Sequence, residues 1–281
     1  MLFAVNQSVQ LGVLHVTQNP SRVIEFAVVE IGECGDRLGV EIGAARLKHR
    51  LSRQSKGTFQ PLKLAGEQFN PDYLKLNPKA VVPTLIHDGE VITESTLICE
   101  YLDDAFTGHP LKPAEALPRA RMRYWTKLVD EEVHPAVRPV TYVSTHRHTI
   151  LKRSPAEVEE HIERDPDPMW RERKRGWIFD GFGAPDVRQA VLFFDNLLVK
   201  MDAILARHEW LTGDTYTMAD SALTPYVNRL DMLGFADMWS PHHHLRRWFD
   251  QVRNRPSFEP ALFQYLPEDL RNDMTSRGRQ A

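Results

Sequence analysis

The sequence predicts two domains: an α/β domain that ends near residue 107, and an all-helical domain that follows a linker at 108–113. A hairpin pattern followed directly by a helix, within residues 81–102, indicates the first domain. Apolar residues at three- and four-residue spacing after residue 115 indicate the second. A chain of 281 residues is long enough to form both cores.

Composition narrows the functional class. The net charge of −3 gives no general attraction to nucleic acid or to acidic membrane surfaces. Two cysteines, Cys34 and Cys99, cannot form a disulfide framework and suit a reducing compartment, and we expect Cys99 to be a small buried apolar residue. The first 16 residues lack a basic leader, and no segment is long and apolar enough to span a membrane. We therefore expect a soluble, cytoplasmic protein without nucleic-acid or membrane partners.

The start of the chain allows two registers, and both make Thr58–Leu64 a strand. In the first register, residues 1–35 are a divergent extension and the domain covers 36–107. In the second, residues 12–32 supply the first strand and helix, and about 25 residues loop out before Thr58. Loops of that length are uncommon in compact domains, which favours the first register.

The hairpin is the clearest local signal. Thr84–His87 and Glu90–Thr93 flank Asp88-Gly89, and Asp-Gly suits a tight turn because both positions tolerate positive φ. Glu94-Ser95-Thr96 then begins a helix. Its apolar residues are expected to form one buried stripe: Leu97, Ile98, Tyr101 and Leu102.

The same stretch offers two backbone binding features. Pro83 has no N–H, and a cis bond at Val82-Pro83 would turn the preceding carbonyl outward, so Val82 can offer its backbone to an extended ligand. The first N–H groups of the Ser95 helix are unsatisfied and partly positive, which favours a carboxylate. A strand-like peptide that carries a carboxylate fits both features. The simpler interpretation is an ordinary hairpin followed by a helix.

With the lead-in AGEQFNPDYLKLNPKA at 65–80, this stretch resembles the second half of the thioredoxin-like domain of cytosolic glutathione S-transferases. The resemblance implies an all-α second domain at 114–270, a homodimer, and glutathione as co-substrate. It places the cysteinyl unit of glutathione on Val82 and Pro83 and the γ-glutamyl end on Glu94 and Ser95, with Lys79 near a glutathione carboxylate.

The excursion at about 144–184 resembles that of bacterial transferases related to β-aryl-etherases and dehalogenases. The implied reaction transfers the glutathione thiolate to an electrophilic, aromatic or hydrophobic small molecule. Four aromatic residues could wall a pocket for it: Trp170, Trp177, Phe179 and Phe182. The alternative is a protein that binds glutathione or a partner without catalysis.

Enzymes of this family activate the thiol with a Ser, Tyr or Cys just after the first strand. In the first register the corresponding loop is 43–45, Gly-Ala-Ala, which has no such group and leaves the catalytic residue unknown. In the second register Ser21 takes that position. A serine beside Pro20 is also typical of a turn or helix cap.

In the second half, a helix is expected from Pro118 because apolar residues recur on one face, and Pro135 and Pro139 should end or kink it near His134. Further helices are expected to begin at capping boxes at Ser154 and Thr217, and at Pro185. The tail after Leu270 is expected to fray. The acidic run 130–132 is expected to be a polar helix face. No metal site is expected at His242–His244, since consecutive helical residues point about 100° apart.

Overall fold

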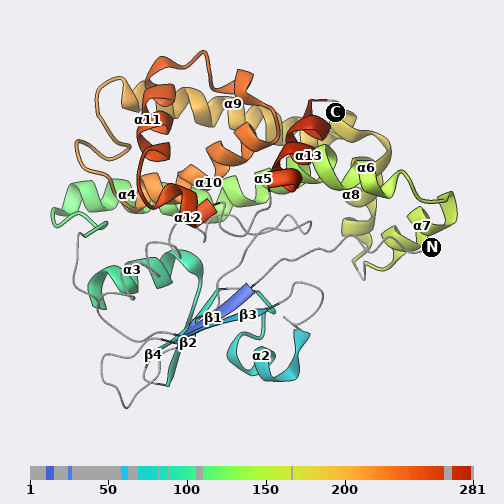
Figure 1. Cartoon of the computed structure of the whole chain (residues 1–281), viewed down its shortest axis with the longest axis horizontal. Helices are drawn as coiled ribbons and strands as arrows, with labels where there is room; N and C mark the ends of the chain where they lie inside the picture. Colours follow the sequence, from blue (N-terminus) through green and yellow to red (C-terminus); the bar gives the residue numbers. More distant parts are fainter. Residues whose placement is uncertain are drawn as a thin grey trace.

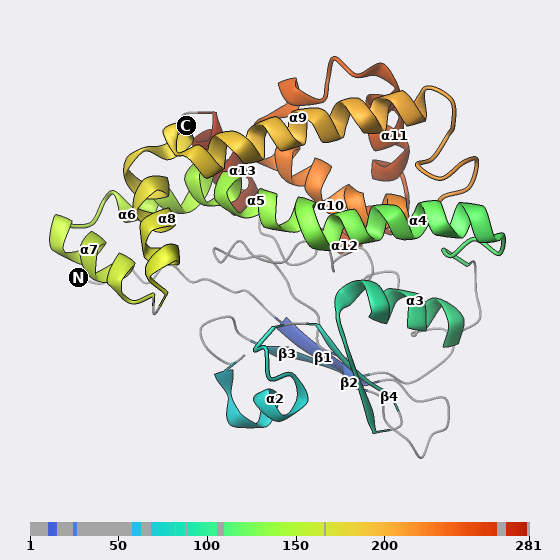
Figure 2. The ribbon, with the colours of Figure 1, turned by 180° about the vertical axis from the view of Figure 1, so that it is seen from behind.

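The computed structural model describes residues 11–15, 25–26, 58–62, 69–81, 83–87, 89–105, 110–165, 167–262 and 268–279. A small sheet and two helices form one domain, and a larger helical domain lies against this domain on one side (Figure 1). The view from behind shows α3 between the sheet and the long helix that begins with α4 (Figure 2). The predicted fold class, an α/β domain followed by an all-α domain, is confirmed, and the predicted domain boundaries stay predictions.

The sheet has five strands in the order β1-β3-β2-β4-β5, with an additional β1–β4 pairing. Their bounds are Leu11–His15, Glu25–Phe26, Thr58–Leu62, Thr84–His87 and Glu90–Thr93, for β1 to β5. Strand β3 runs antiparallel to β1 and parallel to β2, while β4 is antiparallel to β2 and β5. The predicted hairpin is therefore present, and Gly89 has a φ of 88°, as its turn requires.

Strands β1 and β2 come from residues 1–35. This differs from the first register, in which those residues add no strand to the sheet. Strand β2 lies parallel to β3 and antiparallel to β4, so it occupies an inner position in the strand order. A strand added to a sheet pairs backbone groups that would otherwise need water, which is a physical reason for even a short segment to join. The boundary at residue 35 stays a prediction.

Helices α2 (Pro71–Leu76) and α3 (Ser95–Ala105) belong to the sheet domain. Asn70 caps α2 by accepting a hydrogen bond from the Asp72 N–H at 2.9 Å. In α3, Ile98 and Leu102 are buried, but Leu97 is 60% exposed. The predicted stripe is therefore wrong at Leu97, because one helix face cannot include both Leu97 and Ile98 at full burial.

In the described residues of the second domain the regular elements are helices, joined by turns and loops. Its α-helices are α4 (Ala116–Leu128), α5 (His134–Thr141), α6 (Arg147–Ile150), α7 (Pro155–Glu163), α8 (Pro168–Phe179), α9 (Pro185–Leu205), α10 (Met218–Met232), α11 (His243–Arg253), α12 (Phe258–Leu262) and α13 (Glu268–Gly278). Short 3₁₀ turns cover Gly181–Gly183 and Ala236–Met238. Within the described residues, no helix is long and apolar enough to cross a membrane.

Helices α4, α5 and α6 form one continuous rod, because π-helical turns at Val129–Val133 and Tyr142–His146 join them. Of the two outcomes expected from the prolines, an end or a kink near His134, the end is wrong, because the helix continues through His134. Pro139 lies inside α5, and the helix continues past it. A π turn adds a residue and shifts the hydrogen-bond pattern, so a helix can adjust where a proline removes an N–H.

The main core lies between α4, α9, α10 and α11, and the predicted apolar face of the first helix contributes Met122, Trp125, Val129 and Val133 to it. Both predicted capping boxes are present, at Ser154–Glu157 and Thr217–Asp220. The expectation of a frayed tail is wrong. Met274 of α13 is buried among apolar residues of α5, α9 and α10, which gives this segment a reason to stay helical.

Helices α7 and α8 form an excursion held by ion pairs between their facing sides. Arg175 contacts Glu159 at 2.6 Å, and Lys174 contacts Asp165 at 2.6 Å. Trp177 packs with Val143, Ala184 and Val187 in a small core, and Phe179 is 54% exposed. Trp170 and Phe182 pack against the same small core as Trp177, and the hypothesis that these aromatic residues wall a pocket stays a prediction.

Candidate functional site

The β4–β5 hairpin brings the two predicted binding features together. Thr84 pairs with Thr93 across the hairpin, so the next residues outward, Pro83 and Glu94, lie at the same end of the two strands. Pro83 is buried, and Ser95 begins α3 directly after Glu94. Val82 lies outside the described residues. The backbone before β4 and the helix N-terminus after β5 therefore border one small region.

Side chains from α2 fix the segment that leads to Pro83. The Tyr73 hydroxyl donates to the Val81 carbonyl at 2.6 Å, and the Asn77 amide donates to the same oxygen at 2.6 Å. The Tyr73 hydroxyl also lies 2.9 Å from Thr84 Oγ1. Tyr73 and Asn77 are both buried, so these bonds form away from water and hold the Val81 carbonyl in one direction.

Tyr73 and Asn77 were not among the predicted site residues. Both belong to the lead-in at 65–80. Their polar groups, eight and four residues before Val81, were the available signal. The sequence does not show that the chain folds back after α2, so that α2 lies against the start of β4.

Among the residues that the structure describes, two that are not glycine have positive φ, and both border the site. Ala80 has a φ of 51° and Glu94 a φ of 69°. Left-handed backbone is unfavourable for residues with a Cβ and persists only where the surroundings impose it, often at functional sites. Asn77 helps to impose it at Ala80, because the Ala80 N–H donates to the Asn77 carbonyl at 3.0 Å.

Lys79 and Glu94 form an ion pair across the site, with Nζ and Oε1 2.7 Å apart. Both side chains are substantially exposed, so the pair contributes little to stability. It does place a carboxylate and an ammonium group beside the N-terminus of α3. These are groups that a zwitterionic ligand end can contact.

The helical domain adds a carboxylate that was not predicted for this place. Thr96 Oγ1 of α3 donates to Asp130 Oδ2 at 2.7 Å. Desolvation raises the pKa of the Asp130 carboxyl, as do the nearby charges of Glu94 and Glu131, while the Thr96 hydrogen bond lowers it. The acidic run is therefore more than a solvated face, because its first member joins the two domains.

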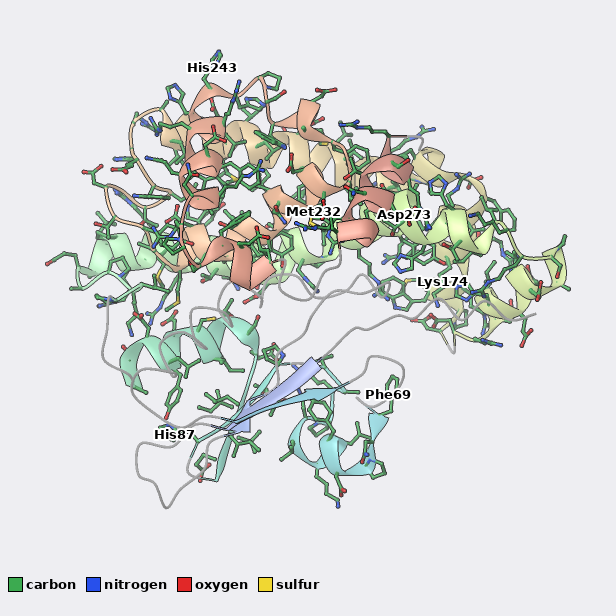
Figure 3. All side chains as sticks on the ribbon, in the orientation of Figure 1. Phe69, His87, Lys174, Met232, His243 and Asp273 are labelled. Atoms are coloured by element: carbon green, nitrogen blue, oxygen red, sulfur yellow. The ribbon has the colours of Figure 1, made fainter. Side chains whose placement is uncertain are left out.

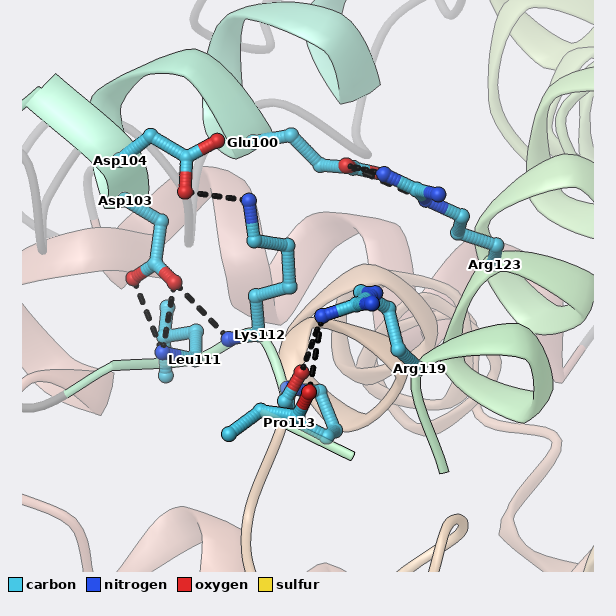
Figure 4. A network of polar contacts seen from close by, with 9 residues as sticks. Glu100, Asp103, Asp104, Leu111, Lys112, Pro113, Arg119 and Arg123 are labelled. Atoms are coloured by element: carbon cyan, nitrogen blue, oxygen red, sulfur yellow. Dashed lines mark hydrogen bonds and ion pairs between the residues drawn. The ribbon is translucent and has the colours of Figure 1, made fainter. Parts of the chain in front are cut away.

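A polar network fixes the linker and holds α3 against α4 (Figure 4). Asp103 accepts hydrogen bonds from the backbone N–H groups of Leu111 and Lys112, each at 2.9 Å. Arg123 of α4 makes a bidentate contact with Glu100 of α3, with the shortest distance 2.6 Å. Since Glu100 contacts α4 and Thr96 contacts Asp130 further along, α3 and the α4 rod run antiparallel.

The residue that would activate a thiol is not defined by these contacts, because Ser21 and the loop 43–45 lie outside the described residues. Cys99 does not serve as a substitute. Burial raises the pKa of its thiol to about 12, so it stays protonated, as expected of a small apolar residue.

No group of three potential metal ligands occurs in the part of the chain that the structure describes. The His242–His244 run lies at the start of α11, with His243 on the outer side of the helical domain, far from the sheet (Figure 3).

Family models match both domains. The glutathione S-transferase N-terminal domain matches residues 50–105, and the glutathione S-transferase C-terminal domain matches residues 184–256. The first match contains the hairpin, Lys79, Glu94 and Ser95, and the second contains the buried capping box of α10.

Protein LigF of Sphingobium sp. strain SYK-6 is 32% identical over 215 residues, which cover 73% of this chain and 82% of LigF. The crystal structure of LigF, described as a β-etherase, superposes with a TM-score of 0.58 over 69% of this chain and 83% of that one. The tetrachloro-p-hydroquinone reductive dehalogenase of Sphingobium chlorophenolicum is 28% identical over 202 residues, 69% of this chain and 80% of that enzyme. Glutathione is the co-substrate of this family, and the chain belongs to the glutathione S-transferases.

Proposed function

We propose that the protein binds glutathione at the end of the β4–β5 hairpin and transfers its thiolate to an electrophilic aromatic or hydrophobic small molecule. The observation that carries the proposal is the hairpin register, which sets Pro83 beside Glu94 and Ser95. The backbone before β4 can pair with the cysteinyl unit, and the α3 N-terminus can receive the γ-glutamyl carboxylate.

Charges at the site support this orientation. The γ-glutamyl end carries an ammonium and a carboxylate, and Glu94 and Lys79 offer one partner of each sign. In this proposal the Glu94 carboxylate exchanges the Lys79 ammonium for that of glutathione. Bonds from α2 to the Val81 carbonyl prepare the neighbouring backbone in advance, which lowers the ordering cost of binding.

The relatives suggest the kind of acceptor. One is described as a β-etherase, and another as a reductive dehalogenase of a chlorinated hydroquinone, which is an aromatic compound. An aromatic electrophile attacked at carbon by the thiolate is the class we propose here.

Calorimetry with glutathione tests the binding site. Ser95→Ala removes a hydroxyl from the first turn of α3, and loss of a hydrogen bond to a charged group should weaken binding by about 1.5–3 kcal/mol. Ser154→Ala is the control for loss of a serine hydroxyl at a helix start away from the hairpin, since Ser154 is the N-cap of α7. A wild-type protein that binds no glutathione would contradict the proposal. Binding without conjugation of chlorodinitrobenzene would favour a binding protein over an enzyme.

We also propose a homodimer in which the sheet domain of one subunit packs on the helical domain of the other. Leu97 on α3 is 60% exposed, and Leu117 and Tyr124 on α4 are 63% and 47% exposed. The Arg123–Glu100 ion pair joins the two helices that carry these exposed apolar side chains. Exposed apolar side chains on adjoining helices are candidates for an interface. Sedimentation should give twice the 32.4 kDa chain mass, and Tyr124→Asp should reduce it; a wild-type monomer would refute the dimer.

A further inference from the structure

Asn77 ends α2 and holds the short segment that leads into β4. Its backbone is extended, as is usual for a residue before a proline, here Pro78. The side chain is buried, at 2% exposure, and a buried amide needs hydrogen-bond partners. Asn77 finds these partners in the residues that follow it.

Three consecutive residues are bound to Asn77. Its Oδ1 accepts from the Lys79 N–H at 3.2 Å, its backbone carbonyl accepts from the Ala80 N–H at 3.0 Å, and its Nδ2 donates to the Val81 carbonyl at 2.6 Å. Ala80, in the middle, has the left-handed φ of 51°. One residue thus imposes this turn, which a residue with a Cβ does not adopt readily by itself.

The direction of the Val81 carbonyl matters for a ligand. A peptide unit that does not precede proline is planar and trans, so its N–H points opposite to its C=O. The Val81 carbonyl points toward α2, where both Asn77 and the Tyr73 hydroxyl donate to it at 2.6 Å. The N–H of the same peptide unit therefore points away from α2, a direction in which it can pair with an extended peptide.

The same turn also bears on the other end of the candidate site. Lys79, whose N–H is bound to Asn77, reaches Glu94 with its Nζ 2.7 Å from Oε1. Glu94 directly precedes α3 at the end of the hairpin. Asn77 thus fixes both the backbone that can pair with a ligand and the position from which Lys79 extends.

We propose that Asn77 is a positioning residue for glutathione: by donating to the Val81 carbonyl, it turns the N–H of that peptide unit toward the cysteinyl unit of the bound tripeptide. The proposal rests on the proposed function and deepens it, since Asn77 acts through the backbone. Tyr73 donates to the same oxygen and shares this role. Without one of the two donors the peptide unit is less ordered in the free protein, and binding must then order it.

Calorimetric titration of the full-length protein with glutathione tests the proposal, because it gives both Kd and the fraction of protein that binds. Asn77→Ala should raise Kd about tenfold, the size expected for one lost hydrogen bond, and leave the binding fraction unchanged. Asn77→Asp should do the same, since it keeps an oxygen for the Lys79 N–H but has no N–H for the Val81 carbonyl. Asn70→Ala is the matched control. Asn70 caps the other end of α2 on the exposed surface, so its loss should leave Kd unchanged.

The readouts separate positioning from stability. A smaller binding fraction with an unchanged Kd would show that Asn77 only supports the fold, and would overturn the proposal. So would an Asn77→Asp protein that binds as tightly as wild type, because the contact with Lys79 would then be sufficient.

Tyr73→Phe removes the other donor to the same oxygen and should also raise Kd. It keeps the proposal testable if neither Asn77 variant folds, and an unchanged Kd for it would overturn the shared role of the two donors. In each of these cases the transferase function would stand, whereas a wild type that binds no glutathione would refute both.

Discussion

The buried capping box of α10 gives a stability prediction whose size follows from the hydrogen bonds of one carboxylate. Asp220 is fully buried, and its Oδ2 accepts from the Thr217 N–H at 2.9 Å and from the Thr217 hydroxyl at 3.2 Å. Its Oδ1 accepts from the Leu211 N–H at 3.0 Å and from the Trp248 indole N–H at 2.9 Å. One side chain thus joins the start of α10, the preceding loop and α11.

Asp220→Ala leaves those three N–H groups without an acceptor in the core. Each unsatisfied buried donor costs about 1–3 kcal/mol, although such costs do not add fully. We expect the variant to lose about 3–5 kcal/mol of unfolding free energy, above the roughly 0.5–2 kcal/mol typical of a lost cap.

The chain contains a matched control. Glu157 holds the same position in the capping box of α7, where it accepts from the Ser154 N–H at 2.8 Å on the exposed surface. Glu157→Ala should therefore cost only the cap. Urea denaturation followed by circular dichroism measures both variants, and calorimetry at native conditions should show unchanged glutathione affinity. Equal destabilisation by the two changes would refute the reasoning, because the added bonds of Asp220 would then contribute nothing.

Three further predictions concern backbone strain, pH and the start of the chain. Ala80→Gly should stabilise the fold by up to about 1 kcal/mol in the same urea assay, since Ala80 has a φ of 51°; a loss of stability would show that the side chain matters more than the strain. Burial, with the charges of Arg229, His161 and Arg277, lowers the pKa of His146 from 6.5 to about 4. As pH falls, the unfolded chain therefore takes up a proton on His146 before the folded protein does. About 3 kcal/mol of unfolding free energy that is present above pH 6.5 should be lost toward pH 4. His146→Gln should make the unfolding free energy depend less on pH over this range. Deleting residues 1–35 removes β1 and β2 and should expose sheet edges and cause aggregation; a soluble truncation that binds glutathione would restore the first register.

Features set by neighbouring residues could be predicted from the sequence. The Asp88-Gly89 turn fixes the hairpin and hence the pairing of Thr84 with Thr93, and both capping boxes are encoded within four residues. The candidate site could be predicted for the same reason, because Pro83, Glu94 and Ser95 directly adjoin the hairpin.

Features that depend on distant partners could not be predicted. The contact of Asp130 with Thr96 joins residues 34 apart, and nothing near Asp130 distinguishes it from a solvated acid. Likewise Met274 keeps α13 helical through apolar residues of other helices. The local sequence pattern also did not show that the helix continues past Pro135 and Pro139, since a π turn is a tertiary adjustment with no short sequence signature.

The π turn at Val129–Val133 sets the phase of everything that follows it in the helix. Adding or removing one residue rotates all later side chains of a helix by about 100°. A single deletion here would therefore swing Val137 and Val140 out of their cores and His134 away from Tyr226 together. This segment should therefore tolerate no change of length, and variation in its length among related chains would alter the packing of α5 and α6 while β4, β5 and α3 keep their places.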